Sequence, residues 1–125
     1  MKITIAGKEQ ELNFDMGFVH EINEKWNIDR NGMKMNMGAA HVFSAMEMGD
    51  IERLADIVYL STYDNSPRCS HKDVIDYVGH LKIDEMEEFF DQVTKEINDS
   101  APVKFAVKKM EKAAKEAQRK TKKTK

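Results

Sequence analysis

The stretch that decides the fold is residues 1–26, which read MKITIAGKEQELNFDMGFVHEINEKW. Apolar and polar residues alternate over 2–14, and Gly7 lies midway, which is the pattern of a β-hairpin. After Asp15, a residue suited to cap a helix, the spacing becomes helical. The apolar residues at that spacing are Phe18, Val19, Ile22 and Trp26. Because an isolated hairpin is only marginally stable in water, its apolar face is expected to pack on helices.

Helical spacing of apolar residues recurs along the rest of the chain. The stretches that carry it are 39–46, 51–58, 74–81, 86–97 and 103–117. Gly49-Asp50 and a polar loop at 64–68 separate some of them, as turn-forming residues do between helices. Ser70 with Asp73 resembles a capping box, and Asp84 is the expected cap of the helix that contains 86–97. The sequence therefore predicts an α+β protein that is predominantly α-helical, with an N-terminal β-hairpin packed on a bundle of about five or six helices.

The length of 125 residues is that of one domain. We expect this domain to span 1–119, with the hairpin at 2–14, a helical body at 15–99 and a C-terminal helix at 101–119. The lysine-rich residues 120–125 contain no apolar side chain and are expected to form a disordered basic tail.

Three methionines, Met33, Met35 and Met37, alternate directly after the turn signal Asn31-Gly32. The alternation predicts either a short edge strand or an extended loop that returns to the N-terminal hairpin. Two interpretations of the methionines stay open. They fill gaps in the core, or they form an adaptable contact surface for a partner chain.

Composition limits the compartment. No apolar run approaches the roughly 20 residues of a membrane span, so no membrane contact is expected. The apolar residues near Met1 are too few for the core of a signal peptide. Cys69 is the single cysteine, which agrees with a reducing compartment. The expected location is therefore the cytoplasm.

Charge is divided unequally along the chain. Residues 103–125 carry ten basic side chains against two acidic ones, a formal charge of +8. Residues 1–102 carry twenty acidic side chains against ten basic ones, a formal charge of −10. This division favours self-association through opposite charges or an acidic partner.

No pattern of catalytic residues is found. The four histidines lie in neither an HExxH nor a zinc-finger spacing, and only Cys69 with His71 comes near a ligand pair. Glu87, Glu88 and Asp91 fall on the polar face of a helix, where carboxylates stay solvated. Glycine-rich phosphate loops are also missing. We therefore predict no enzyme activity, no catalytic residue, no metal site and no cofactor.

The order of the motifs resembles the tail assembly chaperones of siphophages and prophages of Gram-positive bacteria. The resembling residues of the hairpin and first helix are Lys2, Ile5, Gly7, Lys8, Leu12, Phe14, Gly17, Phe18, Glu21 and Ile22. Further resemblance lies in NGMKMNMG at 31–38, in LADIVY at 54–59, in DEMEEFFDQV at 84–93 and in the lysine-rich end. The similarity covers nearly the whole chain, whereas the loop with Cys69 and His71 lies outside it.

The resemblance implies a non-enzymatic chaperone that acts in the host bacterial cytoplasm. It would bind the tape measure protein, keep its apolar helices from aggregating, help to recruit tail tube subunits, and be absent from the mature virion. Many members also exist in a longer frameshifted form. Lys122-Lys123 could be encoded by an A-rich slippery heptamer, a hypothesis that interrupting codons in the gene would remove.

Two segments are candidates for the contact surface. The C-terminal helix is one, because its apolar stripe declines from valine and methionine to alanine and the body would hold it only in part. Its candidate residues are Val103, Val107, Met110 and Ala114, with Lys104, Lys108, Lys109, Lys112 and Lys115. The other candidate is the Met33, Met35 and Met37 segment.

The alternative function is a small phage-encoded regulator that binds nucleic acid through the basic C-terminus. Two features weigh against it. The tail has no aromatic residues for base stacking, and the acidic body would be repelled by phosphates. The best candidate for a helix-turn-helix, residues 51–62 with 70–81, also carries more acidic than basic side chains. Nucleic acid is therefore the less favoured partner.

Overall fold

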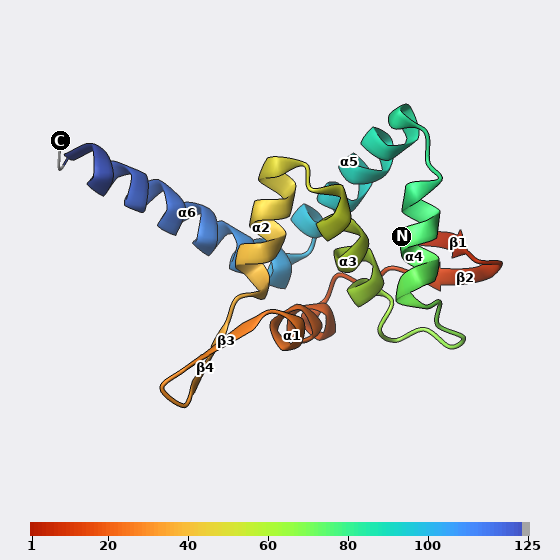
Figure 1. The fold of residues 1–125 in the computed structure, drawn as a ribbon, viewed down its shortest axis with the longest axis horizontal. Helices are drawn as coiled ribbons and strands as arrows, with labels where there is room; N and C mark the ends of the chain where they lie inside the picture. Colours follow the sequence, from red (N-terminus) through yellow and green to blue (C-terminus); the bar gives the residue numbers. More distant parts are fainter. Residues whose placement is uncertain (124–125) are drawn as a thin grey trace.

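Six helices and two antiparallel hairpins make up the part of the chain that the structure describes (Figure 1). This computed structural model describes the backbone of residues 1–123 and the side chains of 1–119. The elements are β1 (Lys2–Ile5), β2 (Lys8–Glu11), α1 (Met16–Lys25), β3 (Asn27–Arg30), β4 (Met33–Asn36), α2 (Gly38–Met48), α3 (Ile51–Ser61), α4 (His71–Gly79), α5 (Ile83–Asp99) and α6 (Ala101–Lys123). The predicted class, α+β and predominantly helical, is confirmed.

The N-terminal hairpin forms as predicted, with strands shorter than the alternation suggested. Ala6 and Gly7 form its two-residue turn, and both have positive φ, as a type I′ turn requires. Strand β2 ends at Glu11, so Leu12 and Phe14 enter the core from the connection to α1. The hairpin packs on a helix, as expected, through contact between β1 and α4.

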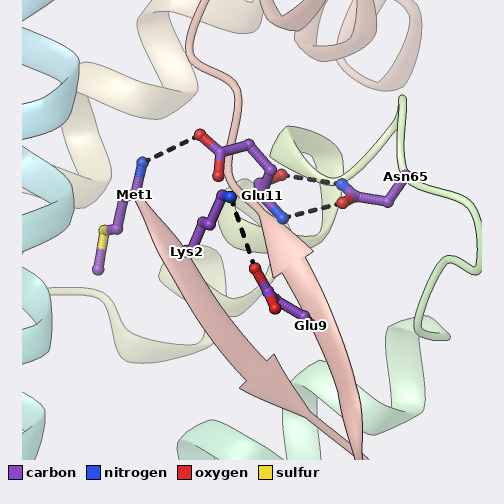
Figure 2. Close-up of polar contacts among 5 residues, drawn as sticks. All are labelled: Met1, Lys2, Glu9, Glu11 and Asn65. Atoms are coloured by element: carbon purple, nitrogen blue, oxygen red, sulfur yellow. Dashed lines mark hydrogen bonds and ion pairs between the residues drawn. The ribbon is translucent and has the colours of Figure 1, made fainter.

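Two amide side chains attach β2 to the loop after α3. Gln10 is completely buried; its Nε2 donates to the Pro67 carbonyl at 2.9 Å, and its Oε1 accepts from the Cys69 N–H at 3.2 Å. Asn65 exchanges two hydrogen bonds of 2.8 Å with the backbone of Glu11 (Figure 2). The Asn65 amide thereby pairs with the backbone N–H and carbonyl of Glu11 at the outer edge of β2, as a neighbouring strand would.

Helix α1 begins where the sequence predicted. Oδ1 of Asp15 accepts a hydrogen bond from the Phe18 N–H at 3.0 Å, which caps the helix. The Tyr63 hydroxyl donates to both oxygens of the same carboxylate, and this hydrogen bond raises the pKa of Tyr63 to about 12. A Cβ on Gly17 would overlap the Tyr63 hydroxyl, so glycine at this position permits the tyrosine to reach the cap.

One continuous core joins the N-terminal hairpin to all six helices of the described chain. Helix α6 packs against α1, α2 and α5, and α3 packs against α1, α2 and α4. The buried apolar side chains are Ile5, Leu12, Phe14, Phe18, Ile22, Val42, Ala45, Leu54, Ala55, Ile57, Val58, Leu60, Cys69, Val74, Val78, Phe89, Val93, Ile97, Val103 and Val107. Most of them lie on the helical stripes that the sequence predicted.

The predicted ends of three helices can be compared with the structure. Ser70 and Asp73 form the predicted capping box, with reciprocal hydrogen bonds of 3.0 Å. The predicted cap of α5 at Asp84 is wrong, because Lys82 is the N-cap and its N–H donates to Glu85 at 2.8 Å. Helix α6 continues to Lys123, beyond its predicted end at 119. Residues 124–125 of the predicted disordered tail lie outside the described residues.

The continuation of α6 has a local cause. Alanine, lysine, glutamine and arginine, which dominate residues 112–120, are all favourable helix formers. Adding residues to an existing helix also avoids the cost of nucleation. Helical propensity therefore extends the backbone structure where the absence of apolar side chains had suggested an irregular tail.

Gly38 allows the start of α2 to lie directly against α1. A Cβ at this position would be 2.6 Å from Ile22 Cγ1 and 2.7 Å from the backbone carbonyl carbon of Ile22. Backbone atoms cannot move aside as the end of a side chain can. We expect Gly38→Ala to lower the free energy of unfolding by about 1–3 kcal/mol through overpacking.

Gly79→Ala is the matched control for this substitution in urea unfolding. A Cβ on Gly79, also within a helix, would meet nothing within 4 Å. Alanine is the better helix former, so this variant should be neutral or gain up to about 1 kcal/mol. Equal stability changes in the two variants would contradict the close approach at Gly38.

Candidate partner-binding surfaces

The Met33–Met37 segment belongs to a second hairpin. Strand β4 pairs with β3, with Ile28 opposite Met35 and Arg30 opposite Met33. Asn31 and Gly32 form the turn with positive φ at both positions. Of the two alternatives, the short strand is confirmed, and the extended loop that returns to the N-terminal hairpin is wrong. An Asn-Gly pair between alternating residues is the signal that indicates a hairpin of its own.

One face of the second hairpin is mostly apolar and exposed. Side chains directly opposite in an antiparallel pair share a face, and residues two apart along a strand do so too. Ile28, Met33 and Met35 therefore lie together, with Arg30 on the same face opposite Met33. The three apolar side chains are 49%, 71% and 47% exposed. We call these three residues the hairpin face. Figure 1 shows the hairpin extending beyond the helices at the end of α1.

The base of the hairpin is attached to α1 and α2. Lys34 Nζ lies 2.8 Å from Glu24 Oε1, and the lysine holds the pKa of that carboxyl below its usual range. The Met37 N–H donates to the Trp26 carbonyl at 2.8 Å, and Met37 is half-buried. The Trp26 ring stacks on His41 with 4.8 Å between ring centroids. These contacts orient the exposed strands relative to the body.

Helix α6 divides into a packed start and an extended remainder. Val103 and Val107 are 0% and 7% exposed, which corrects their prediction as contact residues. They belong to the core because the first turns of α6 pack against α1, α2 and α5. Met110 is half-buried and Ala114 is exposed. Figure 1 shows the rest of α6 leaving the body.

The predicted lysines of α6 all lie in solvent. They are Lys104, Lys108, Lys109, Lys112 and Lys115. Only Lys115 forms an ion pair within the described residues, at 3.1 Å from Glu111. Among these lysines lies Phe105, 66% exposed, which the sequence reasoning missed. Its position two residues after Val103, off the apolar stripe, was the available signal.

A shallow cleft also escaped prediction. It lies where the junction of α2 and α3 meets the first half of α5, and its volume is about 470 Å³. Gly49, Ile51, Ile83, Met86, Glu87, Phe90 and Asp91 line it. Most of the lining side chains are apolar, and two carboxylates, Glu87 and Asp91, lie four residues apart on α5 beside them. We call this feature the acidic groove.

The side chains suited to chemistry do not assemble into a site. Cys69 is buried, and burial raises the pKa of its thiol, which opposes formation of a nucleophilic thiolate. His71 instead contacts Asp56, with 2.7 Å between Nε2 and Oδ1. Across the described residues no group of three or more His, Cys, Asp or Glu side chains could hold a metal ion.

The fold and these surfaces define a mostly helical protein whose exposed elements are suited to binding other proteins. A family model described as phage tail assembly chaperone protein, TAC, matches residues 2–112, and the chain belongs to this family. The resemblance inferred from the order of the motifs is thereby confirmed. Comparison with curated proteins and with solved structures finds no match. None of the helices over 1–123 is long and apolar enough to cross a membrane.

Proposed function

We propose that this chain binds the tape measure protein in the host cytoplasm, keeps it from aggregating and helps to recruit tail tube subunits. The observation that carries the proposal is the exposed hairpin face. Three large apolar side chains on one side of an attached hairpin are between 47% and 71% exposed. Exposed apolar surface of this kind is typical of a protein interaction site.

The chemistry of the hairpin face suits a helical client. Methionine is flexible and polarisable, so two methionines can adapt to successive apolar stripes of differing shape. Such adaptable surfaces favour several related partner segments over a single one. A chaperone of a long helical protein needs this property, because it meets many similar stripes along one chain.

The extended part of α6 supplies a second contact. Met110 and Ala114 continue the stripe whose earlier members, Val103 and Val107, are buried. A client helix packed along this stripe would extend the helix packing that already exists at the start of α6. Recruitment of tail tube subunits is assigned to a longer frameshifted form that would carry further residues after this region.

Co-expression tests the proposal. The tagged chain is produced with the large helical protein encoded downstream, and the client is measured in the soluble fraction and in the material retained on the tag. We expect the client to become soluble and to co-purify. A client that stays insoluble, while the chain retains DNA or RNA in a salt-dependent manner, would support the regulator instead.

Truncation after Glu111 separates the contribution of α6 from its role in folding. This variant keeps the buried Val103 and Val107 and removes Ala114 with the last lysines. We expect it to stay folded and to retain less client.

A further inference from the structure

Two elements of the chain carry opposite charge. Helix α5 contains seven acidic side chains and one basic one, and most of them are exposed. Residues 103–125, by contrast, carry the formal charge of +8. Figure 1 shows α6 leaving the body on the side away from the first turns of α5. The two charged elements of one copy therefore face different directions.

The acidic groove has exposed apolar side chains among its lining residues. Ile83 is 75% exposed and Ile51 is 40% exposed. Glu87 and Asp91 also line the groove, and neither forms an ion pair within the described residues. An occupant that matches the groove needs an apolar anchor with positive charge beside it.

The outer face of α6 has that composition. Phe105, Lys109 and Lys112 lie at i, i+4 and i+7, on the side of the helix opposite to Val103 and Val107. Lys109 Nζ lies 5.6 Å from the centroid of the Phe105 ring. Phe105 is the one large apolar side chain exposed on the described part of α6. We call Phe105 with these two lysines the Phe105 face.

We propose that the Phe105 face of one copy docks in the acidic groove of a second copy. Phe105 packs between Ile51, Ile83 and Phe90, and the lysines approach Glu87 and Asp91. Pairing of two α6 helices with each other is opposed by their like charge. This inference uses only surfaces of the chain itself, so it stands or falls independently of the proposed client.

The contact is head-to-tail, because the groove and the Phe105 face are different surfaces. Each copy in a pair keeps one of the two surfaces free. Contacts of this kind continue into a ring when the rotation closes, and into an open chain when it does not. The hairpin face, which belongs to other elements, takes no part in the contact and remains available to a client.

Sedimentation velocity of the full-length chain tests the proposal. After nuclease treatment, we expect the average mass to exceed that of one chain and to rise with protein concentration. Higher salt should reverse the association, because exposed charges are screened. A single-chain mass at all concentrations in low salt would overturn the proposal, and so would a larger mass that nuclease removes.

Two variants assign the surfaces. Phe105→Ser removes the apolar anchor, and Glu87→Lys with Asp91→Lys reverses the charge of the groove. Each is expected to raise the dissociation constant at least tenfold, because a central anchor dominates a small interface. The matched controls are Ile75→Ser for the anchor and Asp64→Lys with Asp76→Lys for the charges, all exposed and outside both surfaces. The controls should associate as the unmodified chain does.

Mixing the two variants gives the sharpest result. The Phe105→Ser chain still has a groove, and the groove variant still has its Phe105 face. We therefore expect a mixture to form a heterodimer that grows no further, at concentrations where each variant alone is dissociated. Unchanged association in either variant, or a mixture that stays dissociated, would overturn the proposal.

Discussion

Phe18→Ala is expected to lower the free energy of unfolding by about 3–5 kcal/mol, the usual loss for a large aromatic side chain in a core. Phe18 is completely buried, and its ring meets Phe14 edge-to-face with 5.0 Å between centroids. It lies at the start of α1, which packs against α2, α3 and α6. The cavity would therefore open where the connection from the hairpin meets several helices.

This loss is large against the total stability of a small domain, which is typically about 5–15 kcal/mol. Urea unfolding followed by the fluorescence of Trp26, the single tryptophan, measures it. Ile75→Ala is the control, since a large apolar side chain is removed from a position 45% exposed and outside the proposed contact surfaces. A surface substitution should change stability by about 0.5 kcal/mol at most. Equal losses in the two variants would contradict the assigned core.

Replacing the whole hairpin face, with Ile28→Ser, Met33→Ser and Met35→Ser, is expected to lower client binding at least a hundredfold. Truncation of a central apolar contact costs about 2 kcal/mol or more, and three neighbouring contacts are lost together. The fold should persist, because all three side chains are exposed and the turn at Asn31-Gly32 is kept. The amount of client retained in the co-expression assay and the affinity for purified client fragments measure the effect.

The control for this variant lies on the other side of the same strands. Asp29 and Asn36 are exposed, and their side chains point away from the hairpin face. Asp29→Ser with Asn36→Ser should leave client binding within a factor of about two. If both variants solubilise the client as the unmodified chain does, the hairpin face is not the contact surface.

Strand β3 of the second hairpin was not predicted, because most of its residues are polar. Asn27–Arg30 is mostly polar and lacks the apolar alternation that indicates a strand. It becomes β3 because the Asn31-Gly32 turn brings it against β4. Pairing with β4, rather than an apolar alternation of its own, makes this segment a strand. Gln10 was unpredictable for a related reason. A glutamine is normally exposed, and its burial depends on the Pro67 and Cys69 backbone groups far along the chain.

The motif glycines show where local pattern and tertiary packing meet. Gly17 and Gly38 contributed to the family resemblance, and the sequence alone offered no reason for them. The structure explains both by close approach, to the Tyr63 ring in one case and to Ile22 in the other. Neither contact is visible in a helical pattern, because each joins residues that are separated along the chain.

The sequence by itself determined the fold class, the first hairpin, most helix starts and the family. These features depend on residues within a few positions of one another: the apolar period, the caps at Asp15, Asp50 and Ser70, and the order of the motifs. Only the tertiary structure decided that Val103 and Val107 are core residues, that Phe105 is exposed, and that α5 forms a groove with the junction of α2 and α3. Burial depends on which elements meet in space. The groove joins Gly49 and Ile51 to residues of α5 that lie more than thirty positions further along the chain.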